Sequence, residues 1–171
     1  GSYLDRTLED IIKLATKDVE NGEVYLAVNP KRKTAIDYLI QYKESDFEFL
    51  NRLSAEYYEW FYYDGEQLNF GKPDELPRNK ITYGREIKQL DYGMHISPVK
   101  LRRFSYLPQQ DEMVESAGEA KANGHPDFSF AVQKAQGLFN KVYSEPAAVR
   151  VDSIGELKDV VKAEEESQMG Q

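Results

Sequence analysis

The sequence lacks cysteine altogether, and it also lacks long hydrophobic runs and blocks of basic residues. Without thiols the chain forms no disulfide, no thiolate metal site and no cysteine nucleophile. No apolar run approaches the roughly 20 residues that span a bilayer, so we expect no stable membrane insertion. The 22 Lys and Arg residues are dispersed in a chain of net charge −8. This distribution predicts that nucleic acid is not a partner.

Signatures of catalysis are equally scarce. The sequence has no GxSxG, no Gly-rich phosphate loop and no GxGxxG. Its two histidines, His95 and His125, do not stand in HExxH or HxH spacing, so neither is expected to hold a metal. Glu56 and Glu59 are most simply a solvated helix face. We therefore predict no catalytic residues, no cofactor, no metal and no enzymatic activity.

The 171 residues are enough for one domain or two small ones. The stretch 71–77 contains two prolines, which disfavour both helix and internal strand. We place a boundary there, between a portion at 1–76 and a portion at 77–171. Gly1 and Ser2 look like the remnant of an expression vector, so we expect the chain to be a piece of a longer protein.

The most distinctive feature is an aromatic segment at 41–71, QYKESDFEFLNRLSAEYYEWFYYDGEQLNFG, in which ten of 31 residues are Phe, Tyr or Trp. Ser45 and Glu48 form a capping box, which predicts the start of a helix. From Trp60 the hydrophobic period changes to two, and Asp64-Gly65 then turns the chain, so a β-hairpin should follow. The residues we expect in the core of this module are Phe47, Phe49, Leu50 and Leu53.

The rest of the chain predicts an α+β fold by the same signals. Before the aromatic segment we expect a capped helix at about 8–18, a strand at 24–28 and an extended run at 36–42. After it we expect strands at 81–97 and 99–107, an exposed loop at 108–127, a helix at 131–142, a short strand at 148–151, and a helix after Ser153 that frays from Glu164 onward.

The aromatic side chains allow several interpretations. Tyr58, Trp60 and Tyr62, with their acidic neighbours, could stack on a sugar in a carbohydrate-binding or glycan-cleaving protein. That hypothesis requires at least two exposed, parallel rings. The helix and strand periods instead distribute the rings over both faces, which favours an ordinary core. A subunit interface and a peptide-binding hairpin edge are further alternatives.

The segment QYKESDFEFLNRL, followed by YEWFYYDGEQLNFG, resembles the VgrG spike proteins of type VI secretion, whose head is similar to the hub of contractile phage tails. The matching positions are Gln41, Tyr42, Ser45, Asp46, Phe47, Phe49, Leu50, Arg52 and Leu53. Flanking segments at 7–30, 84–108 and 149–168 look like the neighbouring elements of that head. In one departure, the chain has EYYEW at 56–60, where the family usually has an acidic triplet and a glycine.

The resemblance implies a mechanical function. Residues 1–76 would be the helix and β-hairpin portion of the spike head, and 77–171 a barrel-like antiparallel β portion with packed helices. The full-length protein would be a homotrimer that caps the Hcp tube and carries effectors or extension modules during contractile injection. It would be cytoplasmic during assembly and afterwards secreted, outside the cell or into a target cell. A contractile phage tail or baseplate hub is the nearest alternative.

Overall fold

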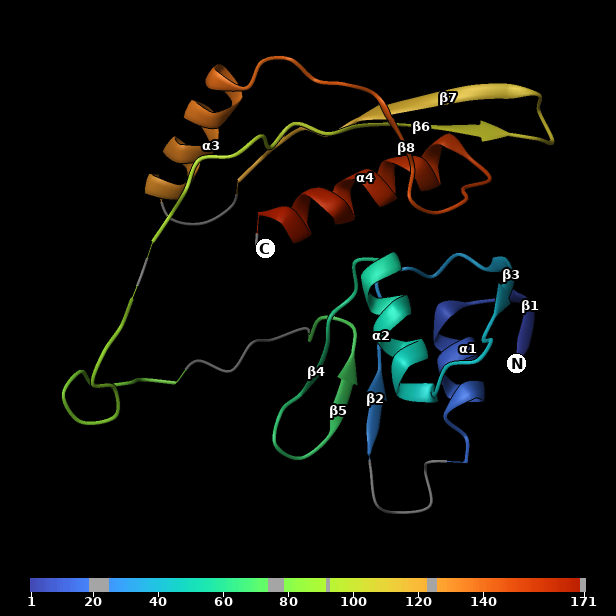
Figure 1. Ribbon diagram of the computed structural model, residues 1–171, viewed down its shortest axis with the longest axis horizontal. Helices are drawn as coiled ribbons and strands as arrows, with labels where there is room; N and C mark the ends of the chain where they lie inside the picture. Colours follow the sequence, from blue (N-terminus) through green and yellow to red (C-terminus); the bar gives the residue numbers. More distant parts are fainter. Residues whose placement is uncertain (19–24, 74–78, 92, 123–125, 170–171) are drawn as a thin grey trace. The chain divides into compact units, whose positions relative to one another are not determined.

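A computed structural model describes residues 1–18, 25–73, 79–91, 93–122 and 126–169 (Figure 1). Within these residues the chain is α+β, with four helices and three small open sheets. It divides into two compact units, Gly1–Glu75 and Leu76–Gln171. The division falls one residue before the boundary that the two prolines suggest.

Unit 1 contains two sheets. β1 (Ser2–Arg6) pairs antiparallel with β3 (Ile36–Ile40). The second sheet has the order β2-β5-β4, with β2 parallel to β5 and β4 antiparallel to it. Its strands are β2 (Leu26–Val28), β4 (Phe61–Tyr63) and β5 (Leu68–Phe70). The predicted hairpin is thus confirmed, whereas β1 was not predicted, because its mostly polar residues become a strand only by pairing with the distant β3.

Both helices of unit 1 begin at predicted caps. α1 (Leu8–Ala15) starts after Thr7, whose hydroxyl accepts the N–H of Asp10 at 3.2 Å. It ends earlier than predicted, and the expected Asn21-Gly22 stop lies outside the described residues. α2 (Asp46–Glu56) starts with the complete capping box of Ser45 and Glu48.

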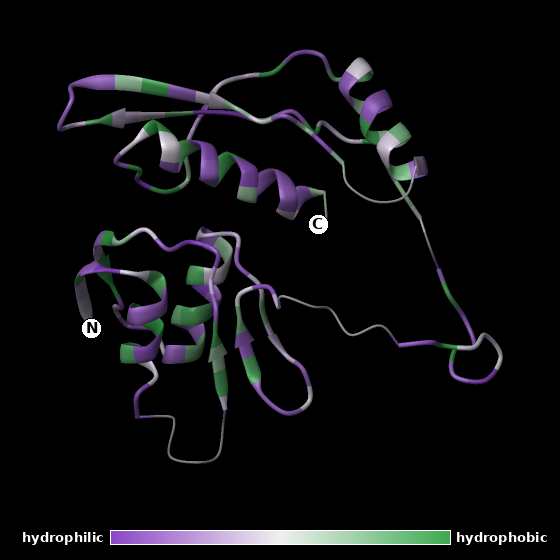
Figure 2. Cartoon of the chain, turned by 180° about the vertical axis from the view of Figure 1, so that it is seen from behind, coloured by the Kyte–Doolittle hydropathy of each residue, from purple (hydrophilic) through white to green (hydrophobic). Residues whose placement is uncertain are grey.

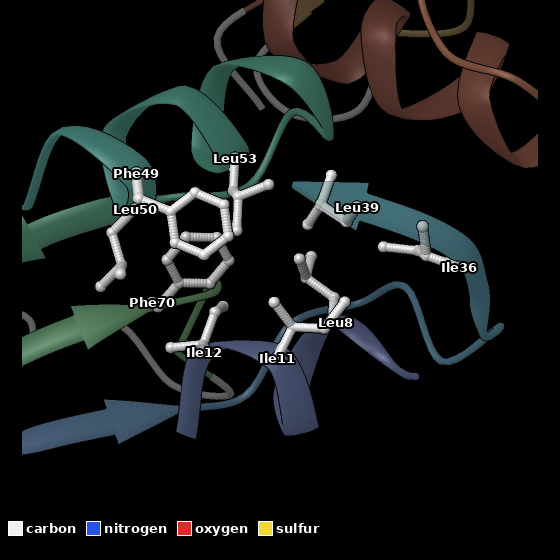
Figure 3. Packing of buried hydrophobic residues seen from close by; sticks show 9 residues of the cluster. All are labelled: Leu8, Ile11, Ile12, Ile36, Leu39, Phe49, Leu50, Leu53 and Phe70. Carbon is white, nitrogen blue, oxygen red and sulfur yellow. The ribbon is translucent and has the colours of Figure 1, made fainter. Parts of the chain in front are cut away.

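The core of unit 1 lies between the two helices and the sheets (Figure 3). Its buried residues are Leu8, Ile11, Ile12, Ile36, Leu39, Phe49, Leu50, Leu53 and Phe70. The ring of Phe49 stacks on the ring of Tyr3, with the two ring centroids 5.8 Å apart. Phe47 does not belong to this core, contrary to the prediction, since its side chain is 60% exposed. At about 100° per residue, Phe47 lies about 110° around α2 from the centre of the buried stripe.

Unit 2 is a three-stranded sheet with helices. Its sheet has the order β7-β6-β8, in which β6 is antiparallel to β7 and parallel to β8. α4 packs on β6 and β7 (Figure 1). The elements are β6 (Arg102–Leu107), β7 (Glu112–Ala117), α3 (Pro126–Leu138), β8 (Glu145–Pro146) and α4 (Ile154–Gln168).

Several predictions for unit 2 are wrong. Of the proposed strand at 81–97, the described residues form only one isolated bridge, between Tyr83 and Ile87. Ile81, Tyr83 and Leu90 are exposed, and an alternating pattern makes a strand only where one face packs on something. The proposed loop at 108–127 contains β7, whose buried Ser116 breaks the apolar alternation that would have indicated a strand.

The C-terminal predictions also need correction. Residues 148–151 are not a strand, and the β8 pairing occurs instead at Glu145–Pro146. Val149 and Val151 are nevertheless buried. The final helix does not fray at Glu164 but continues as α4 to Gln168. Figure 2 shows hydrophobic and hydrophilic residues mixed along this helix. Its last five residues, 164–168, are all polar, which explains why the sequence suggested a frayed tail.

Candidate functional site

The nine predicted motif residues lie around the junction between β3 and α2. The side-chain amide of Gln41 donates a hydrogen bond to Oδ1 of Asp46 at 2.7 Å, and its carbonyl oxygen accepts one from the Tyr3 hydroxyl at 3.3 Å. Gln41 therefore joins β1 to the first turn of α2. The Ser45 cap lies in the same loop, so Gln41, Ser45 and Asp46 all take part in hydrogen bonds at the helix start.

Arg52 holds the junction from the other side. Its Nη2 donates to the carbonyl oxygen of Ile40 at 2.8 Å, and its Nε and Nη2 bind the carboxylate of Glu44 at 3.1 and 2.8 Å. Its Nη1 pairs with Glu56 at 3.1 Å. The hydrogen bonds to Glu44 raise the pKa of Arg52, and the same contact lowers the pKa of Glu44. The planar guanidinium thus fastens the end of β3 to the middle of α2.

The apolar motif residues divide into two groups. Phe49, Leu50 and Leu53 are buried, as predicted. Phe47 instead packs its exposed ring against Phe61, with ring centroids 5.5 Å apart. Tyr42 was also expected in the structural core but is 71% exposed, because it lies two residues beyond the end of β3, in the loop before α2.

α2 ends at Glu56, where the EYYEW stretch at 56–60 begins. The N–H of Glu59 donates to the carbonyl oxygen of Ser54 at 2.9 Å, the six-to-one bond of a Schellman motif. Tyr57 is the C-cap of α2. Tyr58, the next residue, has a φ of 56°. Glycine is preferred at this position because a left-handed backbone strains residues with a Cβ. A tyrosine, Tyr58, therefore occupies the left-handed position of the Schellman motif in which glycine is usual.

Glu59 is not part of a solvated face, contrary to the prediction. It is only 8% exposed, and its carboxylate accepts the N–H of Arg32 at 3.1 Å. Burial raises the pKa of Glu59, although the backbone bonds and the nearby Lys31 and Lys33 act in the opposite direction. The left-handed turn at Tyr58 directs this side chain inward, so helical spacing alone does not describe it.

The hairpin rings do not form a parallel pair. Trp60 and Tyr62 meet edge to face, with an interplanar angle of 78° and centroids 6.1 Å apart. The ammonium group of Lys72 lies 5.6 Å from the centroid of the Trp60 ring. This geometry gives the glycan hypothesis no parallel platform at Trp60 and Tyr62.

No group of three or more His, Asp or Glu side chains suited to a metal ion occurs within the described residues, and His125 lies outside them. In the same part of the chain, no helix is both long enough and apolar enough to cross a bilayer.

A second polar cluster, in unit 2, was not found from the sequence. Glu164 of α4 binds Arg103 of β6. The next residue, Glu165, accepts the N–H of Ala120 at 2.9 Å and that of Glu119 at 3.2 Å. Burial raises the pKa of Glu165. The missed signal is spacing, since both residues continue the buried stripe of the helix at Leu157, Val160 and Val161.

The first cluster joins β3 to α2, and the second joins α4 to β6 and to the backbone at 119–120. No protein-family model matches the chain, and no curated protein matches it significantly.

Proposed function

We propose that the chain is a head fragment of a VgrG-like spike of type VI secretion, a structural component that caps the Hcp tube and carries effectors during contractile injection. The observation that carries the proposal is the junction between β3 and α2. The polar motif residues Gln41, Asp46 and Arg52 bond there to neighbouring elements, and the apolar residues Phe49, Leu50 and Leu53 enter the core. The motif that resembles the family thus connects β3 to α2 and supplies part of the core of unit 1.

The electrostatics of the described residues support a mechanical role. The carboxylates with shifted pKa values have partners within the fold: Glu44 has the Arg52 guanidinium, and Glu59 and Glu165 have backbone N–H groups. These bonds fasten loops to helices. A part that transmits force requires such satisfied internal contacts.

The proposal extends to the finer fold. We assign unit 1 to the helix-and-hairpin portion of a phage tail hub-like head, and the β7-β6-β8 sheet with α4 to its barrel-like portion. The full-length protein would be a homotrimer that assembles in the cytoplasm on an Hcp ring and is then secreted. Extension modules or effectors would be its cargo.

The test is the mass in solution of the chain extended through its natural C-terminus, measured by native mass spectrometry beside the 171-residue chain. We expect the extended protein to have three times its monomer mass. A strictly monomeric extended protein would overturn the proposal.

A second measurement separates the spike from a phage tail hub. The extended trimer is mixed with purified Hcp rings and, in parallel, with the tube protein of a contractile phage from the same genome. Binding to the Hcp ring supports the spike. Binding to the phage tube alone assigns the chain to a tail hub.

A further inference from the structure

The outer edge of the β7-β6-β8 sheet is formed by β7 and has backbone groups that point away from the sheet. β7 is the terminal strand of this sheet within the described residues. In an antiparallel ladder, residues alternate between those that bond to the opposite strand and those whose N–H and C=O point away from it. The bond from the N–H of Gly118 to the carbonyl oxygen of Leu101, at 2.9 Å, sets the phase of this alternation. The backbone groups that point outward are therefore those of Met113, Glu115 and Ala117.

A cleft of about 390 Å³ lies beside this edge, between β7 and the first turn of α4. Its apolar lining comes from Leu107, Met113, Val114 and Ile154, and its charged lining from Glu112 and Glu115. No Lys or Arg lines it within the part of the chain that the structure describes. The half-buried Val114 and the 40% exposed Ile154 form the apolar surface of the cleft on the α4 side, with Glu112 at its edge.

We propose that the β7 edge binds an extended peptide in which apolar residues alternate with Lys or Arg. The peptide adds a strand to the sheet and bonds to the outward groups of Met113, Glu115 and Ala117, as in β-augmentation. Because side chains alternate along a strand, its apolar residues enter the cleft on the α4 side. Its basic residues then lie on the other face, beside Glu115 and Met113, which are two residues apart on β7 and therefore share that face. This inference does not rest on the proposed spike function.

The charge of the edge selects this occupant over a second copy of the chain. Two β7 strands paired antiparallel about Glu115 would place the two Glu115 carboxylates opposite each other, and like charges in that position are destabilising. A basic residue on the peptide instead adds to the contact that Glu115 already makes with Arg102, whose Nε lies 3.9 Å from its carboxylate. Arg102 and the Ser144 hydroxyl both contact Oε1 of Glu115, and the Glu115 side chain is 47% exposed, so a second cation can reach its Oε2.

The test uses the complete 171-residue chain and two fluorescein-labelled octapeptides, one alternating Val with Lys and one alternating Val with Glu. Binding is followed by fluorescence anisotropy at low salt. We expect saturable binding of the Val/Lys peptide, with an affinity at least about tenfold higher than that of the Val/Glu peptide. Equal affinity for the two peptides, or no binding of either, would overturn the proposal.

Two variants separate the backbone contribution from the charge. Ala117→Pro removes an outward N–H without removing a bond to β6, which is the position in a sheet where proline is tolerated. It should weaken Val/Lys binding about tenfold. Glu115→Gln keeps the backbone and removes the charge, and should weaken binding about threefold while reducing its salt dependence. Far-UV circular dichroism checks that both variants remain folded.

Unchanged binding by a folded Ala117→Pro would show that the peptide does not add to the sheet, and would overturn the proposal. If Ala117→Pro does not fold, the proposal is decided by the affinities of the wild type for the two peptides and by the loss of Val/Lys binding in Glu115→Gln. Analytical ultracentrifugation tests whether a second copy of the chain binds the β7 edge. A dimer that forms without peptide and is lost in Ala117→Pro would overturn the proposal and assign the edge to a second copy.

Discussion

Arg103 of β6 and Glu164 of α4 form a two-pronged ion pair, with Nε of Arg103 3.0 Å from Oε2 of Glu164. The Arg103 and Glu164 side chains are 12% and 9% exposed. Nη1 of Arg103 also donates to Glu145 of β8 at 2.8 Å. The Arg103 guanidinium therefore connects β6 both to α4 and to β8, the strand that pairs with β6 in parallel.

Glu164→Gln should lower the free energy of unfolding of unit 2 by about 3 kcal/mol, because it removes the buried counterion of Arg103 and leaves the guanidinium with only the exposed carboxylate of Glu145. Urea denaturation, read by hydrogen exchange of the β6 amides, measures this loss. The matched control is Arg102→Ala on the same strand, which breaks the exposed pair with Glu115 and should cost at most about 0.5 kcal/mol. Equal costs for the two variants would contradict the structural role of the Arg103 pair.

Gly118→Ala should destabilise unit 2 by about 2 kcal/mol. A Cβ at Gly118 would collide with Oε1 of Glu165 and displace it from the N–H groups of Glu119 and Ala120. Gly137→Ala in α3 is the control, since its Cβ would meet no atom within 4 Å and alanine favours a helix. Thermal unfolding should show a lower midpoint for Gly118→Ala and an unchanged or higher one for Gly137→Ala. An unchanged unfolding midpoint for Gly118→Ala would mean that the Glu165 carboxylate does not bind the N–H groups of Glu119 and Ala120.

Glu59→Gln tests the pH dependence of unit 1. Burial raises the folded-state pKa of Glu59 above its ordinary value of 4.5. A raised carboxyl pKa means that its contribution to stability is complete below about pH 4.5 and is lost as the pH rises through the folded-state value. Glutamine keeps an acceptor for Arg32 without this loss. Denaturation from pH 4 to 7 should therefore show Glu59→Gln gaining stability relative to the wild type as the pH rises.

Glu48→Gln should show the opposite pH dependence of stability to Glu59→Gln. Backbone and side-chain hydrogen bonds from Ser45 lower the pKa of Glu48, so its contribution is present above pH 4.5 and is lost as the pH falls through the lowered value. The variant should be less stable than the wild type at pH 7, and the difference should close on acidification. Parallel pH profiles for the two variants would be inconsistent with these shifts.

Tyr58→Gly should raise the free energy of unfolding by about 1 kcal/mol, since it relieves a φ of 56° at a position where glycine is preferred. Tyr58→Ala separates the ring from the backbone, because it removes the ring but keeps the Cβ. Guanidinium denaturation should rank Tyr58→Gly above Tyr58→Ala. The reverse order would show that the left-handed turn is not where the strain lies.

Phe49→Ala should cost about 4 kcal/mol, because it leaves a cavity under α2. Phe47→Ala, two residues earlier on the same helix, should cost about 1 kcal/mol or less, since its ring is mostly solvent-exposed and loses chiefly the contact with Phe61. Urea denaturation of the two variants compares the same chemical change in a buried and an exposed position. Similar costs would place Phe47 in the core after all.

Features that depend on neighbours in sequence were predictable. The caps of α1, α2 and α4 arise at Thr7, Ser45 and Ser153, each of which bonds to the backbone N–H three residues later. The hairpin turn at Asp64-Gly65 is equally local: the Asp64 carboxylate accepts the N–H groups of the two residues after Gly65. Such bonds need only the chain itself, so the residue types reveal them.

Features that depend on distant partners were not predictable. β7 is a strand because β6 offers it a ladder, although its own pattern is that of a polar loop. Ile81 and Leu90 have the pattern of a strand but no described surface to pack on, and they remain exposed. The motif at 41–53 lies between these cases: its helix could be predicted, but the reach of Arg52 back to Ile40 could not.

By itself, the sequence determined the α+β class, the helix starts, the hairpin and the apolar stripe of α2, because these follow from spacing and from bonds within one turn. Only the tertiary structure decided the positions of the charges. Glu59, Glu164 and Glu165 look like solvent-facing acids in the sequence, yet all three are buried. A carboxylate can be buried when a partner compensates its lost hydration. Those partners come from Arg32, Arg103 and Ala120, which the fold brings to them from 27 to 61 residues away.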